Sequence, residues 1–77
     1  MNESKTIAVD LAKDVFEIAV ADAKWRVVER QRLTRAQLSR YFQNHEPVDV
    51  VMESCGTAHY WVRTLKAMGH TVRLLPP

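Results

Sequence analysis

The chain has 77 residues, of which 47% are hydrophobic and 26% are charged, proportions typical of one ordinary globular domain. No apolar run approaches the roughly 20 residues needed to span a bilayer, and the polar start MNESKT lacks the layout of a signal peptide. The formal net charge of +2 permits a nucleic-acid partner but does not by itself argue for one.

The first half of the chain predicts three strands. Residues 5–11 (KTIAVDL) alternate apolar and polar positions and are rich in β-forming residues, and Asp10 stands near their end. Residues 15–21 (VFEIAVA) predict a second strand. Residues 22–24 are a turn without glycine, and 25–32 (WRVVERQR) predict a third strand with a charged outer face. The short links between these segments indicate an antiparallel meander.

The period then changes to that of a helix. Thr34 and Gln37 have the spacing of a capping box, and Leu33 and Leu38 have that of a hydrophobic staple. An apolar stripe continues to His45, which we expect to be half-buried in the core. Pro47 prevents further helix.

The remaining segments predict a strand, a helix and a strand. Residues 48–52 (VDVVM) are almost continuously apolar, as expected of a central parallel strand covered on both faces, and Glu53 ends this run. After Gly56, an apolar stripe that includes Trp61 predicts a second helix, which Gly69 closes as its C′ residue. Residues 71–75 (TVRLL) form a fifth strand.

The resulting order, β-β-β-α-β-α-β, predicts an α/β fold with a mixed sheet and helices packed on its faces. Strands 5–11, 48–52 and 71–75 would be parallel and central. This is the ribonuclease H-like order of elements, which is shared by the amino-terminal half of actin-like sugar kinases. Such kinases need glycines beside the first aspartate, which let the backbone approach a phosphate. Leu-Ala-Lys follows Asp10 here, so the kinase interpretation is the weaker one.

Two carboxylates mark the ends of two strands that this order makes neighbours. Asp10 and Glu53 would lie at the carboxyl edge, where open α/β sheets place their sites. A shared Mg²⁺ or Mn²⁺ would relieve their repulsion, and two such ions can clamp a phosphodiester displacement. Two carboxylates are too few for that clamp. The alternative is structural, with Asp10 capping a turn and Glu53 accepting hydrogen bonds from the next helix.

Several basic residues are candidates for contact with a nucleic-acid backbone. Arg26, Arg30 and Arg32 alternate along the third strand, Arg35 follows closely, and Lys13 lies in the turn after Asp10. A charged edge strand that prevents sheet-to-sheet aggregation explains the same arginines equally well.

The remaining aromatic and thiol side chains have simpler interpretations. Trp25 and Trp61 are expected to be core anchors, and His70 is expected to be a cation near the end of the second helix. Cys55, the only cysteine, precludes an internal disulfide and fits a reducing cytoplasm. With His59 one helical turn away it could act as a nucleophile, but a small residue in a turn is the preferred interpretation.

Two stretches carry a family resemblance. IAVDLAKDVFEIAV and VVMESCGTAHYWVRTLKAMGHTVRLLPP resemble the amino-terminal part of the DEDD transposases of bacterial insertion sequences, the insertion-sequence one-ten family. CGTAHYW and GHTVRLLPP resemble its insertion sequence eleven-eleven branch. The resemblance implies a resolvase-like, ribonuclease H-type catalytic domain, of which residues 1–77 are the amino-terminal portion. Asp10 and Glu53 match the first two acids that bind Mg²⁺ or Mn²⁺, and the other two would follow the equivalent of Pro77.

The resemblance further implies DNA as substrate, a structured guide RNA and a homo-oligomer for the full-length protein. The leading hypothesis is therefore part of a metal-dependent DNA transposase or recombinase, with no nuclease activity expected from these 77 residues alone. The alternative is a non-catalytic remnant that binds nucleic acid or a partner chain, and an actin-like kinase fragment is third.

Overall fold

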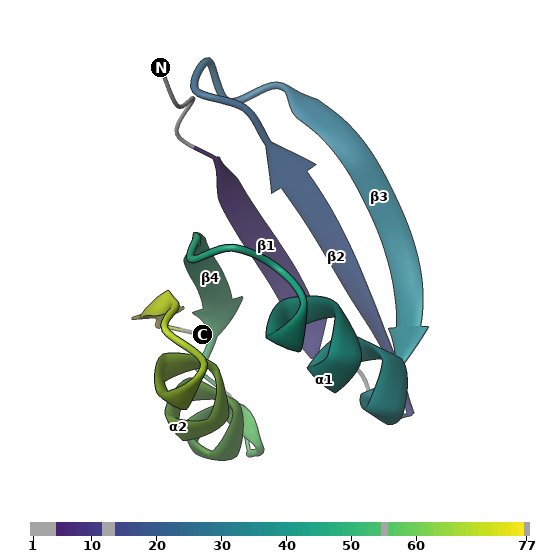
Figure 1. Ribbon diagram of the computed structural model, residues 1–77, viewed down its shortest axis with the longest axis vertical. Coiled ribbons are helices and arrows are strands. Elements are labelled where there is room, and N and C mark those ends of the chain that lie inside the picture. Colours follow the sequence, from purple (N-terminus) through teal and green to yellow (C-terminus); the bar gives the residue numbers. More distant parts are fainter. Residues whose placement is uncertain (1–4, 12–13, 55, 77) are drawn as a thin grey trace.

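The computed structural model describes residues 5–11, 14–54 and 56–76, which form one mixed sheet and two helices (Figure 1). The elements follow the predicted order: β1 (Thr6–Leu11), β2 (Val15–Ala21), β3 (Val27–Thr34), α1 (Arg35–Gln43), β4 (Asp49–Glu53), α2 (Ala58–Ala67) and β5 (Thr71–Leu75). Neither helix is long and apolar enough to cross a membrane. The predicted α/β class is thus confirmed.

The strands are arranged in the order β3-β2-β1-β4-β5. β2 pairs antiparallel with both β1 and β3, as the meander predicted. β1 is parallel to β4, and β4 is parallel to β5. The prediction that β5 is central is wrong, because β5 is an edge strand of the sheet in the described part of the chain.

Both helices pack on the same face of the sheet. α1 connects β3 to β4, and α2 connects β4 to β5, so both connections run in the same direction across the sheet. Because such crossover connections are right-handed, both helices lie on the same face. Alternate strand residues turn toward these helices and share one core with them: Ile7, Val9, Phe16, Ile18, Val20, Leu33, Leu38, Phe42, Val50, Met52, Ala58, Trp61 and Leu65. Phe16 of β2 meets Trp61 of α2 edge to face, with ring centroids 5.7 Å apart.

The other face, called the open face below, carries the remaining strand residues. Ala8 and Asp10 of β1 are exposed there, and Val51 of β4 is half-buried. No element within residues 5–11, 14–54 and 56–76 packs against it. The prediction of a strand 48–52 covered on both faces is therefore wrong for the described residues: Val50 and Met52 are buried, whereas Val51 turns away from the helices.

The β2–β3 turn differs from the sequence prediction. It extends to Arg26, so β3 begins at Val27 and not at Trp25. The Asp22 carboxylate accepts hydrogen bonds from the backbone N–H groups of Lys24 and Arg26, at 2.9 and 3.0 Å. Trp25 adopts the left-handed conformation (φ 63°) and is 73% exposed. The expectation that Trp25 anchors the core is thus wrong, whereas Trp61 is buried.

The helix ends follow their predicted chemistry in part. The Thr34 hydroxyl accepts from the Gln37 backbone, and the Gln37 side chain accepts from the Thr34 backbone, which confirms the capping box. Thr57 at the start of α2 makes no such side-chain bond. Gly69 has φ +97°, a left-handed conformation that glycine adopts without a Cβ clash, so the predicted end of the second helix is confirmed.

His70 is part of the core and not a surface cation at a helix end. Its side chain is buried, and its Nδ1 accepts a hydrogen bond from the Val48 backbone N–H at 3.2 Å. Nε2 then carries the proton and donates to the Phe42 carbonyl at 2.8 Å. His70 therefore ties the end of α1 to the chain entering β4. His45 is half-buried, as predicted, although α1 ends before it.

Candidate functional site

Asp10 and Glu53 lie at the carboxyl ends of neighbouring parallel strands. The β1–β4 register pairs Ala8 with Val51 and Val9 with Met52, so each carboxylate is the next residue along its own strand. Both side chains are exposed and belong to the open face, because they have the parity of Ala8 and Val51. The fold thus brings the two predicted acids to one edge of one face.

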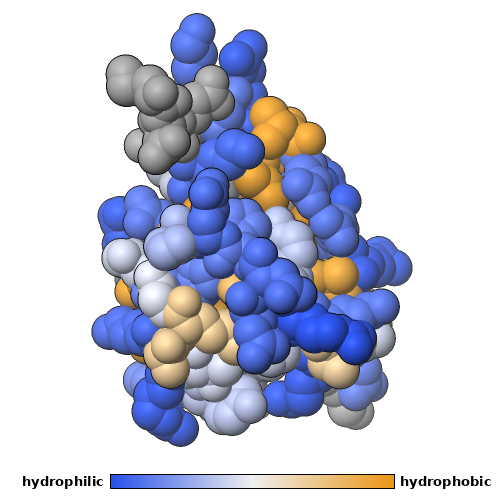
Figure 2. All heavy atoms as spheres, viewed as in Figure 1, coloured by the Kyte–Doolittle hydropathy of each residue, from blue (hydrophilic) through white to orange (hydrophobic). Residues whose placement is uncertain are grey.

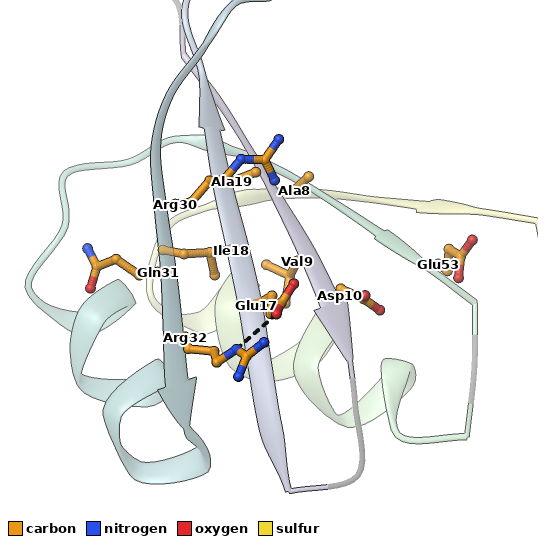
Figure 3. A pocket seen from close by; sticks show the side chains of 10 residues that line it. All are labelled: Ala8, Val9, Asp10, Glu17, Ile18, Ala19, Arg30, Gln31, Arg32 and Glu53. Carbon is orange, nitrogen blue, oxygen red and sulfur yellow. Dashed lines mark hydrogen bonds and ion pairs between the residues drawn. The ribbon is translucent and has the colours of Figure 1, made fainter.

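A third carboxylate lies beside them, which the sequence interpretation missed. Glu17 of β2 is the direct cross-strand partner of Asp10, so both side chains are on the open face. Asp10 is therefore flanked by an acid on each side, and Figure 3 shows it between Glu17 and Glu53. We call these three residues the carboxylate row. The alternation of residues 15–21 in the sequence already indicates that Glu17 lies on the face of its strand away from Phe16, Ile18 and Val20. Only the register between β1 and β2 shows that Glu17 is the neighbour of Asp10.

Arg32 neutralises one end of this row. It is the β3 partner of Glu17, and its Nε donates to Glu17 Oε2 at 3.0 Å. Both side chains are more than half exposed, so water screens the pair and its contribution to stability is small. The interaction matters for charge: Glu17 has a guanidinium beside it, whereas Asp10 and Glu53 make no ion pair with any described residue.

A depression of about 530 Å³ lies over this part of the open face (Figure 3). Its floor includes Ala8 and Ala19, which are cross-strand partners and leave room above the sheet because their side chains are small. Arg30 and Arg32 of β3 line one side, and Asp10 and Glu53 line the other. The depression therefore has cations along one wall and carboxylates along the other.

The donor set fits part of a divalent-metal site. Carboxylate oxygens are the ligands that Mg²⁺ and Mn²⁺ prefer, and both ions keep several water ligands. Within the described residues, however, no group of three or more acidic, histidine or cysteine side chains is close enough to hold an ion. Asp10 and Glu53 thus fit the role of two ligands, and further ligands would have to come from elsewhere.

The predicted nucleic-acid contacts are dispersed by the fold. Arg26 pairs with Asp22 in the turn, at 3.3 Å, and Arg32 pairs with Glu17. The Arg35 guanidinium lies over the rings of Phe16 and Trp61. Arg30 makes no ion pair with a described residue. The predicted contact Lys13 lies outside the described residues.

The remaining sequence candidates lie on or next to the first turn of α2 in the sequence. Cys55 lies outside the described residues. His59 is exposed on the first turn of α2, and Tyr60 beside it is 50% exposed, with its ring edge to face against Trp61.

Comparison with known proteins points to transposases of insertion sequences. The chain is 49% identical over 77 residues to a "Probable family 20 transposase" of Pseudomonas aeruginosa, covering all of this chain and 22% of that protein. It is 38% identical over 77 residues to the transposase for insertion sequence element IS1111A of Coxiella burnetii, covering 21% of it. It is 35% identical over 71 residues to the transposase for IS1328 of Yersinia enterocolitica, covering 92% of this chain and 21% of the relative.

The chain thus spans about a fifth of the length of these curated relatives. No protein-family model matches it.

Among solved structures, the fold is similar to part of a PPX-GPPA enzyme of Aquifex aeolicus. The TM-score is 0.53 at 10% sequence identity, over 99% of this chain and 37% of that one. A second structure from the same organism's Ppx/GppA family gives a TM-score of 0.52 at 11% identity. At such low identity the likeness concerns the arrangement of strands and helices alone.

Proposed function

We propose that this chain is the amino-terminal part of a ribonuclease H-like DNA transposase that cleaves and rejoins DNA strands with divalent metal ions. The observation that carries the proposal is the parallel pairing of β1 with β4, which brings Asp10 and Glu53 to one edge of the open face. The similarity to transposases of insertion sequences supports it independently of that geometry.

In this proposal Asp10 and Glu53 bind Mg²⁺ or Mn²⁺ through their carboxylate oxygens. The bound metal would supply charge neutralisation at the phosphodiester group that is attacked. Asp10 and Glu53 hold the ion at the sheet edge. Arg30 and Arg32, on the opposite wall of the depression, would contact the phosphates of the strand and so keep it over the small floor formed by Ala8 and Ala19.

The described residues provide only two carboxylates free of an ion pair at this edge. We therefore expect the 77-residue chain to bind metal weakly and to cleave no DNA by itself. Completion of the site by further acids, dependence on a guide RNA and oligomer formation are properties that we propose for a full-length protein containing this chain.

Backbone amide NMR spectra recorded during titration with Mn²⁺ test the metal site. Paramagnetic broadening should concentrate at the carboxyl ends of β1 and β4, and Asp10→Asn should remove it. Asp49→Asn is the matched control, because Asp49 is an exposed acid on the same strand and the same face as Glu53, but at the opposite end of β4. Broadening at neither strand end, or equal loss in both variants, would refute the metal site.

A further inference from the structure

The charged residues are divided unequally between the two helices and the rest of the chain. All nine Asp and Glu residues of the sequence lie outside α1 and α2, and the first turns of both helices lack acids. The helices carry Arg35, Arg40, Arg63 and Lys66. A chain with a formal charge of only +2 therefore has a helical layer with four cations and no carboxylate.

The central cations of this layer point away from the sheet. At about 100° per residue, Arg40 is separated by about 160° around the helix axis from both buried residues of α1, Leu38 and Phe42. Arg63 lies equally far from Trp61 and Leu65, the buried residues on either side of it in α2. Both arginines are exposed, and Figure 2, which looks onto the helices, shows hydrophilic side chains there among others of intermediate hydropathy.

These cations are available to a partner. One of the four helical cations, Arg35, lies over two aromatic rings of the described residues. In the part of the chain that the structure describes, Arg40, Arg63 and Lys66 form no ion pair, in contrast to Arg26 and Arg32 of the sheet. Tyr60, half-exposed and one turn before Arg63, adds an aromatic hydroxyl to the same side.

We propose that the outer surface of α1 and α2 binds the phosphate backbone of double-stranded DNA, with Arg40 and Arg63 as the central contacts. The two helices carry cations and no carboxylates, which matches a polyanion, whereas the open face mixes arginines with the carboxylate row. The choice of DNA rests on the proposed function. α2 begins shortly after Glu53, but its outer surface faces away from the open face, so the proposed DNA surface is separate from the carboxylate row.

Fluorescence anisotropy with a labelled 20-bp duplex, between 50 and 200 mM NaCl, tests this surface. With about three phosphates neutralised by Arg40, Arg63 and Lys66, log K should fall against log[NaCl] with a slope of about −2.5 to −3. R40Q/R63Q should reduce that slope by about 2 and weaken binding roughly tenfold or more at 100 mM NaCl. R40K/R63K should keep the slope within about 0.5 of the unmodified chain, because it keeps both charges.

The matched control is K24Q/R73Q, which makes the same change in net charge with one residue in the β2–β3 turn and one on the open face. It should retain the slope. Circular dichroism and thermal unfolding verify that each variant is folded. A third variant, R30Q/R32Q, removes the two arginines beside the depression on the open face. The inference is overturned if the chain does not bind the duplex, or if R40Q/R63Q and K24Q/R73Q weaken binding equally. It is also overturned if R30Q/R32Q weakens binding and R40Q/R63Q does not. Tenfold tighter binding to a matched RNA duplex would overturn the assignment to DNA. None of these outcomes bears on the Mn²⁺ titration.

Discussion

Asp10→Asn is expected to stabilise the metal-free protein, because it removes the central charge of the carboxylate row. Glu17 is the direct cross-strand neighbour of Asp10, and Glu53 is at the equivalent position of the parallel neighbour. Like charges placed directly opposite destabilise a sheet, and asparagine keeps the size of the side chain. In the proposed metal site, these carboxylates would repel one another whenever no cation is bound.

The magnitude follows from the spacing of paired strands. Two unit charges about 5 Å apart in water repel by about 0.8 kcal/mol. Screening at 0.15 M salt, where the Debye length is about 8 Å, roughly halves that value. With two acidic neighbours, one of them paired to Arg32, the free energy of unfolding should rise by about 0.5–1 kcal/mol. For a domain of this size the midpoint of thermal unfolding should rise by about 2–8 °C.

Thermal and urea unfolding in EDTA, at 0.15 M and 1 M NaCl, measure this effect. The stabilisation should shrink at 1 M NaCl, since the Debye length there is only about 3 Å. Asp49→Asn is again the control, because the partners of Asp49 on β1 and β5 are Thr6 and Thr71, and it should change stability by less than about 0.5 kcal/mol. Destabilisation by Asp10→Asn would refute the reasoning and favour the structural alternative, in which the carboxylate caps the turn.

Four further predictions concern the framework. Trp25→Gly should raise the free energy of unfolding in urea by about 1 kcal/mol, because glycine adopts the left-handed conformation (φ 63°) without a Cβ clash. A loss of stability would show instead that the exposed indole makes a stabilising contact. Thr34→Ala should destabilise it by about 1 kcal/mol through loss of the capping box, whereas Thr57→Ala, at a cap without a side-chain bond, should not; equal losses would contradict this account. His70→Ala should reduce stability by about 2–4 kcal/mol, measured by urea unfolding, because it leaves the Val48 N–H and the Phe42 carbonyl without their buried partner; a change below about 1 kcal/mol would refute that role. The backbone N–H of Arg26, together with that of Lys24 and the Arg26 guanidinium, outweighs partial burial and holds the pKa of Asp22 below its ordinary value of 3.8. The ionised Asp22 carboxylate should therefore stabilise the fold fully above pH 3.8, and this stabilisation should be lost as the pH falls through the lowered pKa. Asp22→Asn should flatten this part of the acid-unfolding curve.

Local patterns in the sequence predicted the order of elements well. Alternation identified β1 and β2, the Thr34–Gln37 spacing identified the start of α1, and Gly69 identified the end of α2, because each signal depends on residues only a few positions apart. The predicted neighbours β1 and β4 followed from the rules for crossover connections. The start of β3 was predicted two residues too early, because the hydrogen bonds to the Asp22 side chain extend the turn through Trp25.

The sequence by itself determined which residues are carboxylates at strand ends and which helices are free of acids. Only the tertiary structure decided that Glu17 lies beside Asp10, that Arg32 neutralises it, and that one face of the sheet has no cover in the described residues. It also decided that His70 is buried between α1 and β4. The reason is physical: a residue's own periodicity fixes which face it occupies, whereas its neighbour on the next strand depends on register, which the packing of the whole core sets.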